Sequence, residues 1–168
     1  IGYHSVSVLA DAVAKGLPLD KEEVLKAMVS SSTIPYLDGT GEYMEKGYVA
    51  LDHNGSAASL TLEYAYDDWT IYHTALLAGN RSVADTYKKR AANYTNVFDT
   101  NMGYARPRYA DGRWKENFNL LNTHGEGFIE GNALNYSFYV PQDVDNMIRL
   151  MGGDKSFVSK LDSLFTMH

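Results

Sequence analysis

One segment, residues 59–78, is apolar around its whole circumference when it is drawn as a helix. It reads Ser-Leu-Thr-Leu-Glu-Tyr-Ala-Tyr-Asp-Asp-Trp-Thr-Ile-Tyr-His-Thr-Ala-Leu-Leu-Ala, with large apolar side chains on every side. A helix that is apolar all round is buried all round. Gly79 and Asn80, a typical helix stop, follow it. We therefore predict a helix over Ser59–Ala78 that other elements of the fold surround.

The next segment has only one apolar face. We predict a helix over Ser82–Phe98, in which one stripe is apolar and the basic residues face water; the stripe is Val83, Tyr87, Ala91 and Tyr94, and the basic residues are Lys88, Lys89 and Arg90. This is the pattern of a surface helix with one buried face. Two concentric rings of helices require this alternation of a buried helix and a half-exposed helix.

The rest of the chain is mostly helical in pattern. Periodicity and stop signals predict helices over Gly2–Lys15, from an N-cap at Asp20 to Ser31, over a short turn at Glu42–Lys46, over Pro141–Met151 and after an N-cap at Asp154. The last of these carries an apolar stripe of Phe157, Val158, Leu161, Leu164 and Phe165. Asp111-Gly112 predicts a small β-hairpin over Tyr104–Lys115. The fold class is all-α, either an (α/α) toroid or an α-solenoid, and the lack of a constant repeat disfavours the solenoid.

Composition excludes several classes of function. The 168 residues carry a net charge of −6, which argues against a nucleic-acid partner. No apolar run approaches the roughly 20 residues that span a bilayer, and the absence of cysteine excludes disulfides, thiol catalysis and thiolate metal sites. The five histidines do not show a zinc-ligand spacing, so we predict no metal ligands in this chain.

Three acids, Glu63, Asp67 and Asp68, interrupt the most apolar helix. Glu63 and Asp67 are four residues apart, so they share a face and repel each other. Burying like charges is costly without a compensating proton, cation or polar ligand, and such clusters are typical of functional sites. The alternative is structural: Asp68 bonds loop backbone, and Asp67 pairs with an arginine.

A second candidate lies in Gly127-Phe128-Ile129-Glu130-Gly131-Asn132-Ala133. An apolar setting raises a carboxyl pKa and suits Glu130 to act as a general acid. Asn132 offers an amide to a sugar hydroxyl. The structural alternative for Glu130 is an acid at a helix N-terminus, which the helix dipole favours. The residues alone leave both open.

Several motifs in order resemble one family. They are Ile1-Gly2-Tyr3-His4, the segment Ser59 to Trp69, Glu130-Gly131-Asn132-Ala133, Tyr136-Ser137-Phe138-Tyr139-Val140-Pro141 with Gln142-Asp143-Val144, and Leu150-Met151-Gly152-Gly153 with Phe157 to Phe165. Together they cover nearly the whole chain, and they resemble the catalytic domain of glycoside hydrolase family 92. Leu134-Asn135 depart from the family, which usually has an aromatic residue and then Gln.

The resemblance implies a calcium-dependent, inverting exo-α-mannosidase with an N-terminal β-sandwich and an (α/α)6 barrel. Residues 1–168 then form a single helical fragment, a partial (α/α)6 toroid from the middle of that barrel. Glu130 is the implied general acid. The implied substrate-binding residues are His4, Glu63, Asp67, Asp68 and Asn132, and the implied substrate is a mannose-containing glycan.

The family's calcium-holding Asn-Glu-Pro segment and its base-bearing acidic loop are not in this sequence. We expect both downstream of His168, an inactive isolated chain, and a periplasmic, cell-surface or extracellular parent. A partial ring leaves apolar flanks where the missing barrel helices pack, so we expect an apolar face or self-association. Alternatives are Glu63 or Asp68 as the base, a non-catalytic glycan-binding or scaffold module, and an (α/α)6 hydrolase of another glycan.

Overall fold

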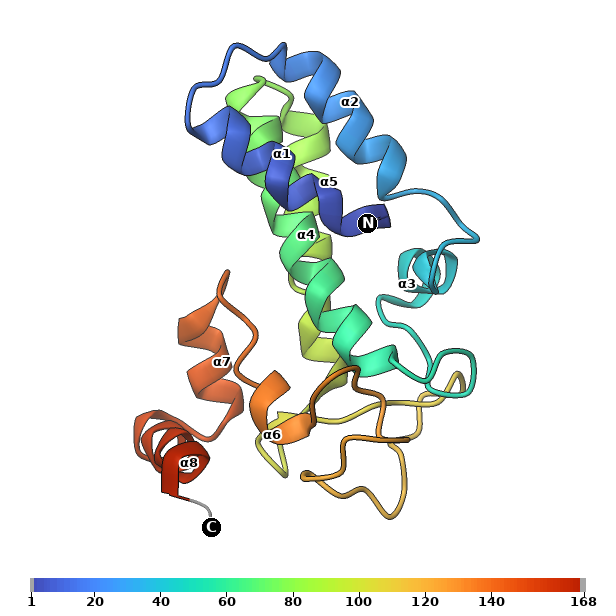
Figure 1. Ribbon diagram of the computed structural model, residues 1–168, viewed down its shortest axis with the longest axis vertical. Coiled ribbons are helices and arrows are strands. Elements are labelled where there is room, and N and C mark those ends of the chain that lie inside the picture. Colours follow the sequence, from blue (N-terminus) through green and yellow to red (C-terminus); the bar gives the residue numbers. More distant parts are fainter. Residues whose placement is uncertain (1, 167–168) are drawn as a thin grey trace.

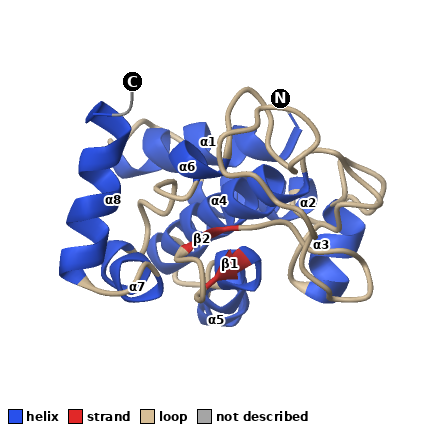
Figure 2. Ribbon diagram, turned by 90° about the horizontal axis from the view of Figure 1, so that it is seen from below, coloured by secondary structure: helices blue, strands red, loops and turns tan. Residues whose placement is uncertain are grey.

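The computed structural model describes residues 2–166, which form helices, irregular connections and one two-stranded antiparallel sheet (Figures 1 and 2). The elements in chain order are η1 (Gly2–His4), α1 (Ser5–Ala14), α2 (Lys21–Ser31), α3 (Thr40–Lys46), α4 (Ala57–Leu77), α5 (Arg81–Arg90), η2 (Asn93–Val97), β1 (Phe98–Asp99), β2 (Tyr104–Ala105), α6 (Ala133–Tyr136), α7 (Val144–Leu150) and α8 (Asp154–Thr166). The all-α fold class is confirmed.

Helix α4 is the centre of the molecule, as its sequence predicts. It has 21 residues, and α5, α1, α2 and η2 all pack against it (Figure 1). Its buried side chains lie on several sides, and only its C-terminal end is open, where Leu76 and Leu77 are exposed. The helix begins two residues before the predicted Ser59 and ends one residue before Ala78.

Two hydrophobic cores meet at α4. One contains Tyr3, Met28, Tyr43 and Ile71 and joins η1, α2 and α3 to the central helix. The other contains Leu62, Tyr94, Phe98, Phe128 and Met147 and joins the central helix to the sheet, the loop before α6, and α7. Because both cores share α4, a side chain on this helix is positioned by both halves of the chain.

The predicted helix over Ser82–Phe98 is wrong at its C-terminal end. Helix α5 starts at Arg81, after the N-cap Asn80, and ends at Arg90, beyond which a turn leads into η2. The segment Asn93-Tyr94-Thr95-Asn96 lacks strong helix formers, which explains the early end. Arg90 was also expected to face water, but it turns inward to an ion pair with Asp68.

The predicted hairpin is confirmed in part. Tyr104–Ala105 pairs with the upstream Phe98–Asp99, whereas an isolated bridge between Arg108 and Trp114 closes the turn at Asp111-Gly112. Helix α7 does not begin at Pro141, because Asp143 is its N-cap and accepts a hydrogen bond from the Asn146 amide.

The expected apolar stripe of α8 is present and partly covered, because Phe157 packs against the core that contains Phe128. Asp154 is the first residue of this helix rather than its N-cap, and none of the helix's residues is buried. Val158 and Phe165 are exposed, as are Leu76 and Leu77 of α4. Exposed apolar side chains therefore occur on α8 and at the C-terminal end of α4, while the expected apolar face and self-association stay predictions. No helix within residues 2–166 is both long and apolar enough to cross a membrane.

Candidate active site

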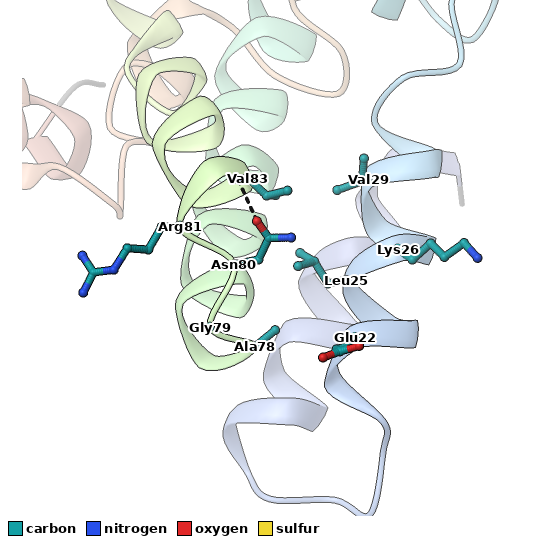
Figure 3. Close-up of a pocket in the computed structure, with 9 residues that line it drawn as sticks. All are labelled: Glu22, Leu25, Lys26, Val29, Ala78, Gly79, Asn80, Arg81 and Val83. Atoms are coloured by element: carbon teal, nitrogen blue, oxygen red, sulfur yellow. Dashed lines mark hydrogen bonds between the residues drawn. The ribbon is translucent and has the colours of Figure 1, made fainter.

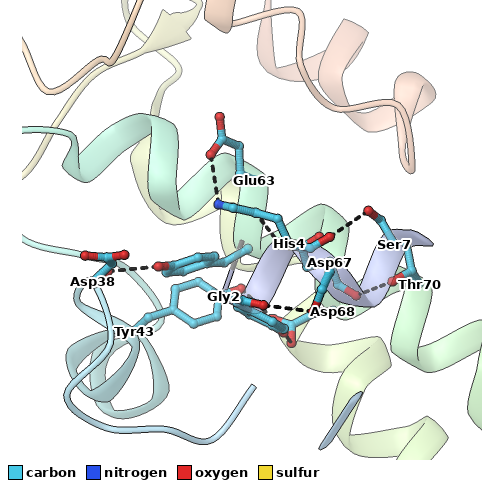
Figure 4. Close-up of polar contacts among 12 residues, drawn as sticks. Gly2, His4, Ser7, Asp38, Tyr43, Glu63, Asp67, Asp68 and Thr70 are labelled. Atoms are coloured by element: carbon cyan, nitrogen blue, oxygen red, sulfur yellow. Dashed lines mark hydrogen bonds and ion pairs between the residues drawn. The ribbon is translucent and has the colours of Figure 1, made fainter. Parts of the chain in front are cut away.

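His4, Glu63 and Asp67 come together where η1 crosses the first half of α4 (Figure 4). The His4 Nδ1 lies 2.8 Å from Asp67 Oδ2, and its Nε2 lies 3.5 Å from Glu63 Oε2. The four-residue spacing of the two acids puts both beside one imidazole, as the sequence predicts for a shared face. The His4 side chain is 45% exposed and that of Glu63 23%, whereas Asp67 shows only 3%. The cluster therefore has an accessible edge and a buried base.

The electrostatics of the cluster follow from this burial. The hydrogen bond with Asp67 raises the pKa of the His4 imidazole, against the opposing effect of partial burial. Burial raises the pKa values of the Glu63 and Asp67 carboxyls, although His4 lowers both. Like-charged acids with a cation between them can accept hydrogen bonds from neutral hydroxyl groups without further charge compensation.

Two tyrosines follow Gly131, and one of them, Tyr136, contacts the cluster. The Tyr136 hydroxyl donates to Glu63 Oε1 at 3.0 Å. Burial raises the pKa of Tyr136, and the negative charges of Glu63 and Glu130 raise it further. Burial also raises the pKa of Tyr139 to about 12, with added effects of Asp67 and Glu63. Apart from an aromatic run, no local pattern indicates the Tyr136 contact, because the partners are 73 residues apart.

Asp68 does not lie at the accessible edge, and its predicted role in substrate binding stays a prediction. It is 0% exposed, and its carboxylate accepts hydrogen bonds from the hydroxyls of Tyr3 and of Tyr43, the latter at 2.6 Å. Arg90 Nε lies 2.9 Å from Asp68 Oδ1. Burial raises the Asp68 pKa to about 6, because its effect outweighs the lowering by these three partners. Two neighbouring residues of one helix thus have different roles. Asp67 contacts His4 in the cluster, whereas Asp68 binds Tyr3, Tyr43 and Arg90 in the protein interior.

The side chain of Asn132 also makes hydrogen bonds within the fold. It is the N-cap of α6, where its side chain accepts from the Asn135 amide and the Asn135 side chain accepts from the Asn132 amide. Its Nδ2 donates to the Leu121 carbonyl at 3.3 Å. The same residue type explains both interpretations, because asparagine is among the preferred N-caps. The predicted hydrogen bond to a sugar would compete with this capping box.

Glu130 lies at the end of a segment that docks on the N-terminus of α4. The amides of Ala58 and Ser59 donate to the Gly127 carbonyl at 2.9 and 3.2 Å, and the Ile129 amide donates to Ser59 Oγ at 3.2 Å. Glu130 itself is exposed and has a positive φ of 52°. The expected apolar surroundings are absent on one side, since Ile129 is 47% exposed. A non-glycine residue with positive φ is uncommon and costs conformational energy.

The described residues do not build a metal site. Residues 2–166 contain no group of three or more His, Asp or Glu side chains arranged to hold a metal ion. A hollow of about 580 Å³ lies between α2 and the turn from α4 to α5, where Glu22, Lys26 and Asn80 are among its lining residues (Figure 3). It lies at the far end of α4 from Glu63, and its polar groups do not converge on one point.

Solved structures match this arrangement over nearly the whole chain. A family GH92 α-mannosidase from Bacteroides thetaiotaomicron is 36% identical, with a TM-score of 0.94, over 99% of this chain and 22% of its own. The structure of that enzyme in complex with mannoimidazole gives 35% and 0.95, over 99% of this chain and 23% of the other. A GH92 inverting mannosidase from the same organism is 33% identical, with a TM-score of 0.89, over 95% and 22%. The expected partial α/α toroid is confirmed by this likeness.

A curated relative is also described as a glycosidase. An uncharacterized secreted glycosidase from Arthroderma benhamiae is 26% identical over 202 residues, which cover 97% of this chain and 26% of the relative. The chain thus spans about a quarter of the length of the relatives that it matches. The model of the glycosyl hydrolase family 92 catalytic domain matches residues 1–168. The chain therefore belongs to glycosyl hydrolase family 92 and carries catalytic-domain sequence of that family.

Proposed function

We propose that this chain forms one wall of the catalytic cleft of an inverting exo-α-mannosidase. In this proposal His4, Glu63 and Asp67 bind hydroxyl groups of the terminal mannose, and Glu130 is the general acid. The observation that carries the proposal is the likeness, at a TM-score of 0.95, to an α-mannosidase in complex with mannoimidazole. The partly open cluster of His4 and two acids supports it, because such a cluster suits a ligand rich in hydroxyls.

The reaction needs two carboxyl groups with different tasks. In an inverting glycosidase one acid protonates the glycosidic oxygen while a second carboxylate takes a proton from the attacking water. The two groups stand about 6.5–9.5 Å apart, so that the water fits between the base and the sugar. Glu130 is assigned the first task because the resemblance to the family implies that the glutamate of its Glu-Gly-Asn motif, here Glu130-Gly131-Asn132, is the general acid. Its proton goes to the departing oxygen as the bond to the anomeric carbon breaks.

The second carboxyl group is proposed to lie outside this chain. The burial of Asp68 supports this proposal, because its carboxylate has no exposed surface and already has three partners. Glu63 accepts from Tyr136 and lies beside His4, an environment that suits a hydroxyl-binding group.

A calcium ion, which the family resemblance implies, does not fit the described residues alone. We propose no step that involves it, and its ligands are expected elsewhere in the enzyme.

The location of the enzyme is proposed from one of its relatives. The Arthroderma benhamiae relative carries the description of a secreted glycosidase. A mannosidase that removes terminal sugars from external glycans works where those glycans are. We therefore propose a periplasmic, cell-surface or extracellular location.

The test replaces Glu130 with Gln in the complete enzyme that contains this chain. Loss of a general acid costs about 10²–10⁴-fold in rate. The loss should reach this range for an α-mannobiose, whose leaving group needs a proton, and should be much smaller for a 2,4-dinitrophenyl mannoside. Equal losses on both substrates would reassign Glu130 to binding or structure.

Glu126 supplies a matched control four residues upstream. It is buried, and its Oε2 lies 3.1 Å from Lys115 Nζ, so its role is structural. Glu126→Gln should lower the stability of the enzyme and leave the ratio of its rates on the two substrates unchanged. The isolated 168-residue chain should hydrolyse neither substrate; turnover by the purified chain would show that it already contains the base.

A further inference from the structure

Helix η1 contacts α4 through two residue pairs, and the members of the two pairs are neighbours in sequence on both helices. Two consecutive residues of η1, Tyr3 and His4, meet two consecutive residues of α4, Asp68 and Asp67 (Figure 4). The Tyr3 hydroxyl donates to Asp68 in the interior, while the His4 imidazole bonds Asp67 at the cluster. Because each pair consists of neighbours in sequence, a shift of η1 along α4 breaks both contacts together.

The interior half of this contact is anchored on three further elements. Asp68 accepts from Tyr43 of α3 at 2.6 Å and pairs with Arg90 of α5 at 2.9 Å. Arg90 Nη2 also lies 3.3 Å from the Ser32 carbonyl, just beyond α2, and 3.4 Å from the Tyr3 hydroxyl. Tyr3, Tyr43 and Asp68 are each at most 1% exposed. The Asp68 carboxylate is therefore a fixed point in the protein interior.

The outer half has no such support. The His4 side chain is 45% exposed, and within residues 2–166 its ring has polar side-chain contacts with Asp67 and Glu63 only. One face lies near the Tyr64 ring, with centroids 5.6 Å apart. Nothing else in the described residues holds the imidazole in place, so its orientation depends on the backbone of η1. That backbone is pinned one residue earlier, at Tyr3.

We propose that Tyr3, Asp68 and Arg90 are positioning residues: through the backbone of η1 they hold the His4 imidazole against Asp67 and Glu63. The inference rests on the proposed function only in assigning that cluster to the sugar. The arrangement also explains why a fully buried ionic group stands directly beside the site, where an apolar residue would pack at less desolvation cost. A buried ion pair gives a fixed geometry that an apolar contact does not.

Two tyrosines provide a matched pair of variants. Tyr3→Phe and Tyr43→Phe each delete one buried hydroxyl that donates to the same Asp68 carboxylate. They differ in one respect: Tyr3 is the neighbour of His4, whereas Tyr43 lies on α3. Both variants should lose a similar amount of stability, which chemical denaturation measures. Only Tyr3→Phe should loosen the contact of the His4 imidazole with Asp67 and Glu63.

The readout is the His4 ring in the complete enzyme that contains this chain, labelled with ¹⁵N-histidine and followed by nuclear magnetic resonance without sugar. In the wild type and in Tyr43→Phe we expect a protected Nδ1–H signal, because that proton lies in the bond to Asp67. In Tyr3→Phe this signal should be lost to exchange with water. Asp67→Asn, which removes the carboxylate acceptor itself, serves as the reference for its loss.

Several outcomes would overturn the proposal. They are an intact signal in Tyr3→Phe, equal loss in both tyrosine variants, and absence of the signal from the wild type. If Tyr3→Phe does not fold, Arg90→Lys replaces it, because lysine keeps a cation near Asp68 but no longer reaches the Tyr3 hydroxyl. An unchanged signal in that variant also contradicts the proposal. Failure of the mannosidase assignment leaves these signals unaffected, since the measurement involves neither sugar nor turnover.

Discussion

The region around Asp68 and the region around Glu130 hold a carboxylate in opposite ways. Asp68 is fully buried, and partners from three other elements surround it. Glu130 is exposed and stands in a left-handed backbone conformation. It follows a segment that docks on α4 through main-chain and serine hydrogen bonds and through the buried Phe128. The first arrangement resists movement, while the second leaves the carboxyl group free toward the solvent.

This contrast separates Asp68, which holds the fold in place, from Glu130, whose carboxyl group is accessible for chemistry. A buried carboxylate whose two oxygens both have protein partners supports the fold and is a poor proton donor to a substrate. A carboxylate in a strained and open backbone position is the more usual state of a functional residue. If this contrast is right, substitutions at the two sites should separate stability from activity.

The largest effect is expected from Asp68→Ala. Removing one partner of a buried ion pair leaves Arg90 and two tyrosine hydroxyls unsatisfied, which costs about 3–5 kcal/mol of unfolding free energy. Urea denaturation followed by circular dichroism measures this change. Glu130→Ala, at an exposed position, should change stability by no more than about 0.5 kcal/mol. A cost below about 1 kcal/mol for Asp68→Ala would remove the contrast.

The next effect concerns the docking segment itself. Gly127 has a φ of 82°, and an added Cβ would lie 2.8 Å from the Pro107 Cβ. Gly127→Ala should therefore cost about 2–3 kcal/mol, from backbone strain and the clash together. Gly125→Ala is the matched control, because its φ is 72° but nothing lies within 4 Å of the added Cβ. It should cost only about 1 kcal/mol, and equal costs in denaturation would mean that the packing on Pro107 contributes nothing.

Much of the scaffold was predictable from local pattern. The all-round apolarity of residues 59–78 placed the central helix within two residues at its start, and Asp20 caps α2 as its residue type suggests. Such features depend on residues close together in sequence, whose side chains meet within one or two helical turns. The shared face of Glu63 and Asp67 was predictable for the same reason.

The partners of those residues were not predictable in this way. Arg90 follows two lysines that do face water, and nothing in its neighbourhood distinguishes it from them. Its inward turn depends on Asp68, which is on another helix, and on Tyr3, 87 residues away. Asn132 had a readable signal, since an asparagine before a short helix is a typical N-cap, but a sugar-binding amide would look the same in sequence. Long-range pairing decided both cases.

A smaller effect, and one of opposite sign, is expected at Glu130. Glycine tolerates positive φ, so Glu130→Gly relieves the strain of the 52° conformation, while glycine adds entropy to the unfolded chain. The variant should range from neutral to about 1 kcal/mol more stable than the wild type. In the complete enzyme it should lose activity, as Glu130→Gln does. A clear loss of stability in thermal unfolding would mean that Glu130 supports the fold, and the contrast with Asp68 would fail.

The smallest effect is a pH dependence at the edge of the cluster. The hydrogen bond with Asp67 raises the His4 pKa above its ordinary value of 6.5, although partial burial opposes this, and Glu63 adds to it. A folded-state pKa above the unfolded value means that the folded chain holds the proton more tightly. The resulting stability is therefore fully present below pH 6.5 and is lost as the pH rises through the folded pKa. Because the side chain is 45% exposed, solvent screening should keep this contribution below about 1 kcal/mol.

Nuclear magnetic resonance titration of the His4 ring measures this pKa directly and does not depend on unfolding. Asp67→Asn should bring the His4 pKa down toward its ordinary value, because it removes the partner at 2.8 Å. Glu63→Gln should lower it less, since that oxygen lies 3.5 Å away. The ranking of the two variants matters more than either value, because distance and burial both favour Asp67 as the dominant partner. A wild-type His4 that titrates at or below 6.5, or a larger effect of Glu63→Gln, would show that the imidazole is not held on Asp67 in solution.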